Sequence, residues 1–295
     1  GDSPFVFHEN IESVWKKTGM AKIAREENFE LVNFEKSGAC LKVVETRGYY
    51  ISKSALEVDL IINLPKLRTD PWCGFAGGIR NMLGVLPGFQ KGMLYRKNHY
   101  QKIIAQILVD IYSLVQPELN IVDAISNEGN ELAGFLFVST DSVAVDAVLT
   151  EVLGIDQNKV YVVRYATDAG LGIGWLEGID IVGETIENIK INNLSGYKSN
   201  GNILISKIAL MLSGSLGWVK PNIDKKLCTS CGICANVCPT HTLSINEEDN
   251  IPTFNHDLCV KCWSCLANCS VGAIHLKKSP FEGNLFHPNR RYCVT

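Results

Sequence analysis

The 295-residue sequence lacks an excess of basic residues: 28 Lys and Arg stand against 31 Asp and Glu, a formal net charge of -3. It also lacks a basic cluster with interleaved aromatic residues, so we expect no nucleic-acid partner. No long uncharged apolar run is present. The strongest candidate, residues 203–219, contains Lys207, Ser213, Ser215 and two glycines, so we expect no membrane span.

Two nucleotide-binding motifs are missing as well. The sequence has no G-x-x-x-x-G-K-[ST], the pattern that cradles phosphates in P-loop proteins. Residues 170–174 read GLGIG, but they lack the spacing and the preceding strand of a dinucleotide-binding turn. A flexible loop is therefore the simpler interpretation of this glycine-rich stretch.

Cysteine, in contrast, is abundant, with 11 residues in the chain, eight of which fall between Cys228 and Cys269. Disulfide scaffolds are typical of short secreted chains without a sufficient core, and this chain is long. Metal binding is therefore the better interpretation. The eight cysteines form two runs of C-x2-C-x2-C-x3-C, one from Cys228 to Cys238 and one from Cys259 to Cys269.

This spacing is typical of iron–sulfur cubanes, in which three cysteines of a run bind one cluster and the fourth reaches the other. Zinc sites use paired C-x2-C knuckles without an evenly spaced third cysteine, so zinc is the weaker interpretation. Residues 221–278 resemble two-cluster bacterial ferredoxins, which implies electron transfer. We assign Cys228, Cys231, Cys234 and Cys269 to the first [4Fe-4S] cluster, and Cys259, Cys262, Cys265 and Cys238 to the second.

The chain before residue 218 alternates helical and strand patterns. Helices are expected at residues 12–27, 99–115 and 142–152, with Asp141 as the cap of the last, and strands at 58–64, 120–125, 134–138 and 179–182. Such alternation predicts an α/β fold whose sheet is mainly parallel and has helices on both faces. We expect three segments: this body over residues 1–218, a small α+β ferredoxin-like domain over 219–278, and a tail over 279–295.

Charged residues follow several of the predicted strands. In α/β sheets ligands bind beyond the carboxyl ends of the strands, so we expect a ligand site there. Basic side chains suit a carboxylate or phosphate, and the acids could hold a cation or move protons. The alternative is that the acids form turns and caps, and that Cys73, in the same region, is a buried apolar side chain. The candidate ligand-binding residues are Lys66, Arg68, Asp70, Arg80, Asn81, Asp123 and Glu128.

Five segments of the body resemble, in order, the DUF362 family of uncharacterised proteins. They are NLPKLRTD (63–70), GGIRNMLGVLPG (77–88), NIVDAISNEGN (120–130), DSVAVDAVLTEVLGI (141–155) and DAGLGIG (168–174). Family members commonly begin further upstream and often carry a C-terminal two-cluster ferredoxin, so the resemblance implies that N-terminal sequence is missing here. The family usually reads PKLKTH where this chain has Arg68 and Asp70, so any role of that histidine is in doubt here.

From these features we expect an iron–sulfur oxidoreductase in the reducing cytoplasm of an anaerobic or microaerobic prokaryote. A soluble redox partner protein would feed single electrons through two [4Fe-4S] clusters to a small molecule bound by the body. Two alternatives stay open. In one, the chain is a ferredoxin-like relay or adaptor whose body docks a partner enzyme without catalysis. In the other, the body is a non-redox enzyme and the clusters sense redox state.

Overall fold

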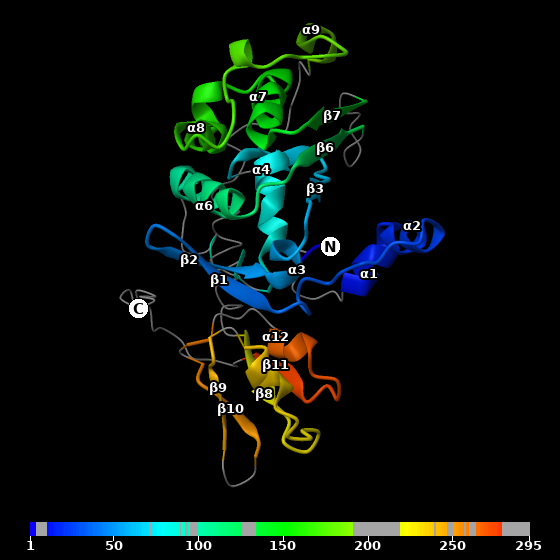
Figure 1. The fold of residues 1–295 in the computed structure, drawn as a ribbon, viewed down its shortest axis with the longest axis vertical. Coiled ribbons are helices and arrows are strands. Elements are labelled where there is room, and N and C mark those ends of the chain that lie inside the picture. Colours follow the sequence, from blue (N-terminus) through cyan, green and yellow to red (C-terminus); the bar gives the residue numbers. More distant parts are fainter. Residues whose placement is uncertain are drawn as a thin grey trace. The chain divides into compact units, whose positions relative to one another are not determined.

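The chain folds into two compact units, each with its own set of elements (Figure 1). Unit 1 comprises Gly1–Ser54, Leu86–Lys91 and Ile208–Thr295, and unit 2 comprises Ala55–Val85 and Gly92–Lys207. The computed structural model describes residues 1–3, 11–70, 72–88, 90–91, 94, 100–125, 134–190, 219–238, 240–246, 250–256, 258–259 and 264–278.

Unit 2 contains a three-stranded sheet and the longest described helices. The short helix α3 (Lys53–Leu56) leads into this unit. The strands are β3 (Ile62–Asn63), β4 (Arg68–Asp70), β5 (Gly74–Ala76), β6 (Leu119–Ala124) and β7 (Phe135–Ser139). The helices are α4 (Gly78–Asn81), η1 (Met82–Val85), α6 (Gln101–Leu114), α7 (Ser142–Val152), η2 (Gln157–Lys159), α8 (Tyr161–Asp168), η3 (Leu176–Gly178) and α9 (Ile186–Ile189).

The fold is mixed α/β, but the expected mainly parallel sheet is not confirmed. In the three-stranded sheet, β3 pairs parallel with β6, and β6 pairs antiparallel with β7. All other strand pairs within the described part of the chain are antiparallel. The reason lies in the connections. Short links join the antiparallel pairs that are consecutive in the chain, β1–β2, β4–β5, β6–β7 and β9–β10, whereas a parallel pair needs a long crossover, which α6 provides between β3 and β6.

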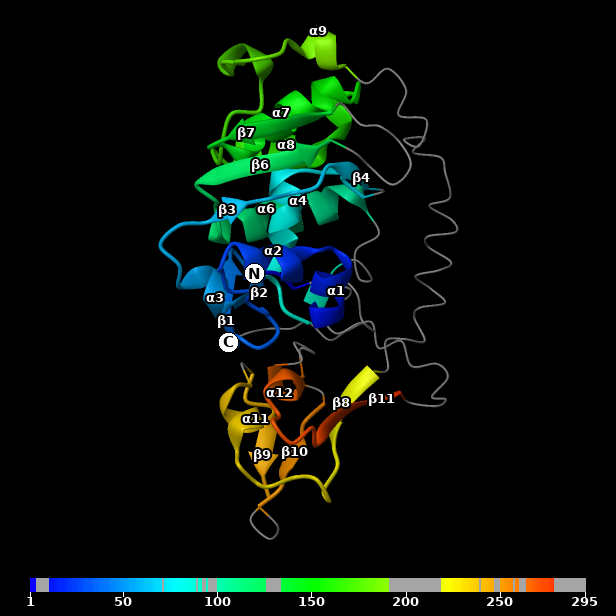
Figure 2. The same ribbon diagram turned by 90° about the vertical axis from the view of Figure 1, so that its right-hand side faces the viewer.

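Helices on both faces of the sheet were also expected, but the described helices lie on one face. α6, α7 and α8 stand to one side of β6 and β7 in Figure 1 and behind these strands in Figure 2. Side chains of β7 and α7 share an apolar cluster on that face. On the opposite face Ile62, Leu136 and Val138 are 50%, 55% and 62% exposed. One side of the sheet is therefore uncovered by the described elements.

Strand β3 explains why the sequence pattern was misleading. The apolar run at 58–64 predicted a buried strand, yet Leu60 and Leu64 are exposed and only Ile62–Asn63 form a strand. The side chain that points to the helices is the polar Asn63, which is 4% exposed. The buried side of this strand is therefore polar.

Most other predicted elements of the body are present. α6 and α7 confirm the helices expected at 99–115 and 142–152, and β6 and β7 lie within one residue of the expected strands. The helix expected at 12–27 is divided by Gly19, whose φ of 80° belongs to the left-handed region, into α1 (Ile11–Lys17) and α2 (Met20–Glu26). The strand expected at 179–182 is not formed.

The N-terminal part of unit 1 adds a hairpin that the sequence patterns did not predict. Strands β1 (Ala39–Val44) and β2 (Arg47–Ser52) pair antiparallel from Ala39↔Ser52 to Val44↔Arg47. The turn between them uses Glu45 at a φ of 53°, a conformation that tight hairpin turns require.

The C-terminal part of unit 1 is a small α+β module. Strand β8 (Val219–Ile223) pairs with β11 (Ile274–Lys278), and β9 (Leu243–Ile245) pairs with β10 (Pro252–Phe254). Two short helices, α11 (Ile233–Asn236) and α12 (Ser264–Ala267), each contain a cysteine of one run. The module thus repeats one plan twice, as its two cysteine runs predict.

The start of α7 shows how a loop of unit 2 is held in place. The Asp141 carboxylate accepts hydrogen bonds from the N–H groups of Val143 (2.7 Å) and Ala144 (3.0 Å), which confirms the predicted cap. Its second oxygen accepts from Ile173 N–H at 2.8 Å. A Cβ at Gly172 would lie 2.3 Å from Asp141 Oδ1, so only glycine permits this approach. The glycine-rich loop is anchored here.

We expect Asp141→Ala to lower the free energy of unfolding by about 1–2 kcal/mol, because α7 loses its cap and the 168–174 loop loses a tie. Urea denaturation followed by circular dichroism measures this. The matched control is Asp180→Ala, which removes an exposed aspartate outside any helix and should change stability by about 0.5 kcal/mol or less. Equal losses in both variants would contradict the capping role.

Candidate functional site

The predicted ligand residues of the body fall into separate polar groups of unit 2. The most accessible group joins Lys66 to Asp123, whose Nζ and Oδ2 atoms are 2.9 Å apart with the two side chains 52% and 41% exposed. Backbone hydrogen bonds hold the two segments together, from Leu67 N–H to Asp123 O and from Asp123 N–H to Pro65 O, both 2.8 Å. The hydrogen bond from Lys66 lowers the pKa of Asp123. Both side chains can meet solvent-borne molecules.

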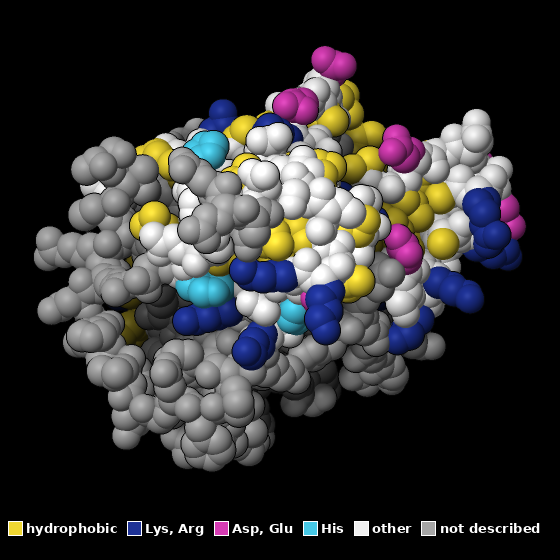
Figure 3. Space-filling model, turned by 90° about the horizontal axis from the view of Figure 1, so that it is seen from below, with side chains coloured by type: hydrophobic (Ala, Val, Ile, Leu, Met, Phe, Trp, Pro, Cys, Tyr) yellow, Lys and Arg dark blue, Asp and Glu magenta, His cyan; other side chains and the backbone are white. Residues whose placement is uncertain are grey.

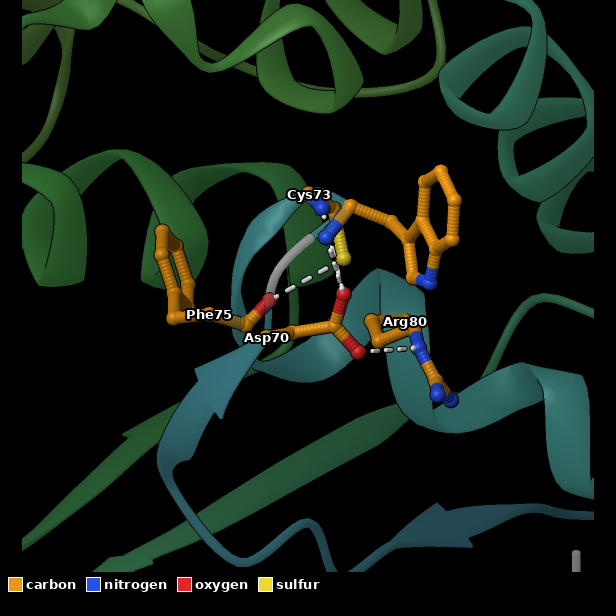
Figure 4. A network of polar contacts seen from close by, with 5 residues as sticks. Asp70, Cys73, Phe75 and Arg80 are labelled. Atoms are coloured by element: carbon orange, nitrogen blue, oxygen red, sulfur yellow. Dashed lines mark hydrogen bonds and ion pairs between the residues drawn. The ribbon is translucent and has the colours of Figure 1, made fainter. Parts of the chain in front are cut away.

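Asp70 lies at the end of β4 and organises the turn of the β4–β5 hairpin (Figure 4). Its Oδ1 accepts hydrogen bonds from the N–H groups of Trp72 (2.9 Å) and Cys73 (3.2 Å), and its Oδ2 accepts one from Arg80 Nε at 3.2 Å. The Arg80 and Asp70 side chains are only 16% and 9% exposed. Both side chains are therefore occupied in holding the hairpin against α4.

Cys73 is buried in the same hairpin. Its thiol donates to the carbonyl of Phe75 at 3.3 Å, as Figure 4 shows. Burial, followed by the negative charge of Asp70, raises the pKa of the Cys73 thiol well above its usual range. A reactive cysteine needs a thiolate. The interpretation as a buried apolar side chain therefore fits Cys73 better than a redox role.

Side-chain amides tie β3, β6 and α4 together, and of these Asn63 and Asn120 are buried whereas Asn81 is exposed. Asn63 Nδ2 donates to Gly78 O and to Asn120 Oδ1, both at 2.9 Å, and Asn81 Nδ2 donates to Asn63 Oδ1 at 2.7 Å. Ser142 Oγ donates to Asn120 Oδ1 at 2.8 Å. The predicted ligand residue Asn81 is thus engaged within the fold.

The carboxylate of Asp146 completes this cluster from α7. It accepts hydrogen bonds from the N–H groups of Gly78 (2.6 Å) and Ile79 (3.1 Å) at the start of α4. Asp146 is 3% exposed, and this burial raises its pKa to about 7, although the two hydrogen bonds act in the opposite direction. We call Asn63, Asn120, Ser142 and Asp146, with the Gly78 backbone, the buried polar junction.

Sequence reasoning missed the buried polar junction, although it contained a signal. Asn63 and Asn120 stand within apolar strand segments, IIN and LNIV, where a polar side chain must find a partner if it is buried. Gly77 carries a second signal, since a Cβ there would lie 2.1 Å from Asp146 Oδ1. The first glycine of GGIRN is explained by this close approach of the carboxylate.

Two predicted ligand residues are left. Arg68 is exposed at the start of β4, two residues after Lys66. Because side chains two residues apart in an extended chain point to the same side, Lys66 and Arg68 share one side of this segment. Glu128 lies outside the described residues. Of the seven predicted residues, the described geometry leaves Lys66, Arg68, Asn81 and Asp123 accessible, although Asn81 is hydrogen-bonded to Asn63, and it ties Asp70 and Arg80 into the fold.

The cysteines of the C-terminal module line its apolar core. Cys238 and Cys265 are buried together with Leu243 and Ile274, and Cys234 and Cys269 pack against the same cluster. Cys228, Cys231 and Cys259 are partly or fully accessible, and Cys262 lies outside the described residues. Thiols gathered in an apolar core are the donor set that an iron–sulfur cluster needs.

Hydrogen bonds already surround one of these sulfurs. Cys238 Sγ contacts the Thr242 hydroxyl at 3.3 Å and accepts from Thr242 N–H at 3.4 Å. Burial alone would raise the pKa of the Cys238 thiol, but the hydrogen bonds from Thr242 and Thr240 outweigh it and lower this pKa. Such N–H and O–H contacts stabilise a metal-bound thiolate, so Cys238 fits the ligand role.

A site for one metal ion is a different arrangement. Over the part of the chain that the structure describes, no three His, Cys, Asp or Glu side chains converge as ligands of a single ion. In a cubane each thiolate binds a different iron, so its cysteines need not converge on one point.

Comparison with known families finds two matches along the chain. The domain of unknown function DUF362 matches residues 1–151, and a 4Fe-4S dicluster domain matches residues 227–273. The chain belongs to the DUF362 family. Its C-terminal module carries two [4Fe-4S] clusters.

Relatives of this DUF362 protein match parts of its length. A thylakoid-associated protein of Synechocystis is 31% identical over 115 residues, 36% of this chain and 36% of that protein. The iron-sulfur polypeptide of the CoB–CoM heterodisulfide reductase of Methanocaldococcus jannaschii is 28% identical over 116 residues, 34% of this chain and 16% of that polypeptide. Ferredoxin-1 of Rhodobacter capsulatus is 42% identical over 40 residues, 14% of this chain and 58% of that ferredoxin. The chain thus spans less than two thirds of each of these relatives.

None of the helices among the described residues of the DUF362 protein is both long enough and apolar enough to span a membrane.

The buried Asp146 predicts a pH dependence of stability. Its pKa is about 7 in the folded chain and 3.8 as the unfolded reference, so the folded state binds more protons between these values. Its contribution to the free energy of unfolding therefore falls as pH rises from about 4 to about 7, and is constant above that. Urea denaturation at about pH 5 and about pH 8 measures the difference.

Asp146→Asn should remove this part of the pH dependence, because the amide keeps an acceptor oxygen for Gly78 N–H but does not titrate. Asp180→Asn, at an exposed aspartate, should retain it. If the Asp146→Asn curve follows the wild-type curve over the whole range, Asp146 does not titrate in this way.

The cysteine runs predict the metal content. Iron and acid-labile sulfide analysis should return about eight iron atoms per chain, four for each cluster. If Cys231 binds one cluster, as the spacing predicts, Cys231→Ala should leave about four. Cys40→Ala, outside the runs, should keep about eight. About four iron atoms in the wild type, or zinc in their place, would contradict the ligand assignment.

Proposed function

We propose that this protein transfers single electrons, from a protein donor through its two [4Fe-4S] clusters to a ligand held by the DUF362 body. Cys228, Cys231, Cys234 and Cys269 bind the first cluster, and Cys259, Cys262, Cys265 and Cys238 bind the second. The observation that carries the proposal is the pair of cysteine runs within a matched 4Fe-4S dicluster domain. The clusters supply one-electron redox chemistry when bound.

The accessible residues of the body support a ligand site at Lys66, Arg68 and Asp123. Two basic side chains on the same side of an extended segment suit a ligand with a carboxylate or phosphate. The Lys66–Asp123 pair is exposed, and exposed ion pairs contribute little free energy, so an anionic ligand can compete for Lys66. Asp70 and Arg80 then act by fixing the hairpin that presents Arg68.

The relay is the second candidate function, and specific observations favour it. Asp70 and Arg80 are engaged with one another within the fold, which reduces the set of side chains left for a ligand. In addition, the iron-sulfur polypeptide of a heterodisulfide reductase is similar to part of this chain, and that protein is by its name one component of an enzyme. On this proposal the body docks a partner enzyme and performs no chemistry.

A reducing cytoplasm is the proposed location, because [4Fe-4S] clusters need protection from oxidants. The lone cysteines support such an environment. Neither Cys40 nor Cys73, the two described cysteines outside the runs, forms a disulfide with another described cysteine, and free thiols persist where the glutathione and thioredoxin systems keep them reduced.

The test of the ligand site is the small molecule that co-purifies with the anaerobically isolated protein. Mass spectrometry of the denatured sample should detect a bound anionic molecule in the wild type. Lys66→Ala combined with Asp123→Ala should lose it by about tenfold or more, since charge-assisted contacts contribute about 1.5–3 kcal/mol each.

The matched control is Lys190→Ala combined with Glu151→Ala, an ion pair of similar geometry at 2.8 Å with side chains 40% and 34% exposed. This control should retain the molecule. If the Lys66 and Asp123 variant retains it equally, the ligand site is wrong and the relay is favoured.

A further inference from the structure

The two strands that enclose the C-terminal module carry a basic face. In the antiparallel β8–β11 ribbon, Lys220 lies directly opposite Lys277, and Asn222 lies opposite His275. Side chains directly opposite one another share a face of the ribbon. Pro221 and Ile274, one residue along on each strand, are buried on the other face. Lys220, Lys277 and His275 are exposed.

Two more lysines follow β8 at once. Lys225 and Lys226 are exposed in the turn after this strand. Asp224 interrupts the basic run, but its Oδ1 accepts the Lys226 N–H at 2.9 Å and shapes the turn. We call Lys220, Lys225, Lys226 and Lys277 the lysine face. In Figure 3, lysine and arginine side chains gather near histidines on the face of the molecule seen there.

The lysine face arises from segregation of charge, because the module as a whole is balanced. Residues 221–278 contain five acidic and five basic residues. Four of the five acids, Glu247, Glu248, Asp249 and Asp257, come after residue 246, whereas lysines stand at both ends of the module sequence. The strand pairing brings those two ends together. The concentration of positive charge is thus a product of the fold.

The lysine face is unfavourable for the isolated protein. Like charges directly opposite on paired strands destabilise a sheet. Lys220, Lys226 and Lys277 make no ion pair with another described residue to offset this repulsion. Carboxylates from a partner would relieve it, and complementary charge of this kind accelerates association.

The position of the lysine face beside a proposed cluster suits electron entry. Lys226 precedes the proposed ligand Cys228 by two residues, so their Cα atoms are at most about 7 Å apart. The strand β11 begins five residues after Cys269, a second proposed ligand of the same cluster. Cys228 N–H also donates to Asp224 O at 3.1 Å, and Asp224 N–H to Ala273 O at 2.8 Å. The lysine face and two proposed ligands of the first cluster are therefore linked through the same short, hydrogen-bonded backbone segments.

We propose that the lysine face is the docking surface for an acidic one-electron carrier protein. Each encounter oxidises the reduced carrier by one electron and reduces the first cluster by one electron, so no bond or proton is exchanged. The inference rests on the proposed electron-transfer function and names the class of its donor.

The probe is a strongly acidic flavodoxin in its reduced form, mixed anaerobically with the complete, cluster-loaded chain in a stopped-flow instrument. The second-order rate constant should fall steeply as ionic strength rises from about 20 mM to about 200 mM. Lys220→Glu combined with Lys277→Glu should lower it by about tenfold or more at low salt. Titration calorimetry with oxidised flavodoxin should show a matching loss of affinity.

The control variant is Lys22→Glu combined with Lys42→Glu, which changes the net charge by the same amount at exposed lysines of α2 and β1. It should retain most of the rate and affinity. Lys277→Gln separates docking from stability. It should raise the urea midpoint by removing repulsion with Lys220, yet weaken association with flavodoxin.

Illumination with 5-deazariboflavin, a small uncharged photocatalyst, in the presence of a sacrificial amine as the electron donor separates failure of the surface from failure of the function. The docking surface alone would be overturned if deazaflavin reduces all variants and flavodoxin reduces the wild type and the Lys220 and Lys277 variant at equal rates. A wild type that deazaflavin cannot reduce would overturn electron transfer itself. Vesicles of anionic phospholipid test whether the lysine face binds a membrane instead of a protein. The proposal would also be overturned if vesicle binding depends on Lys220 and Lys277 while the flavodoxin rate does not.

Discussion

The carboxylate of Asp146 is the interaction on which the DUF362 body depends. From the middle of α7 it binds the first two N–H groups of α4, which lie 67 and 68 residues earlier in the chain. Asn63 of β3 binds the same turn at Gly78 O, and Asn120 of the neighbouring parallel strand β6 accepts hydrogen bonds from Asn63 and Ser142. Because these groups are buried and few, each must be satisfied by the others. The family motifs therefore work as a set, since four of the five quoted segments contribute to one connected group of hydrogen bonds.

In this arrangement, the residues that hold the fold together are different from those that solvent can reach. The buried polar junction and the Asp70–Arg80 pair fix the strands, the hairpin and α4, whereas Lys66, Arg68 and Asp123 remain at the surface above them. A site whose accessible side chains are held by a satisfied second layer keeps its geometry without a ligand present. In the cysteine module, Cys238 is held in a similar way, because its sulfur is hydrogen-bonded to Thr242.

Features governed by nearby residues were predictable from the sequence. The cysteine runs, the helices α6 and α7 and the Asp141 cap all depend on spacings of a few residues, and the iron–sulfur character and the family follow from them. The orientation of β3 depends instead on partners 15 and 57 residues away, which no local pattern contains. Asp70 differs, since its carboxylate is used by the hairpin turn two and three residues later and by Arg80 ten residues later, and its role toward a ligand stays a prediction. The uncovered face of the three-stranded sheet was not predicted, because an apolar run in the sequence does not indicate which face of the sheet a helix covers.

The paired strands β8 and β11 also bear on how the protein avoids self-association. A strand at the edge of a small sheet offers unpaired N–H and C=O groups to strands of other molecules. Here Pro221 removes one donor in the middle of β8, and Lys220 and Lys277 place positive charge beside it. Two copies that approach through this ribbon would bring four lysines together. The β8–β11 ribbon is therefore protected from edge-to-edge pairing with other molecules.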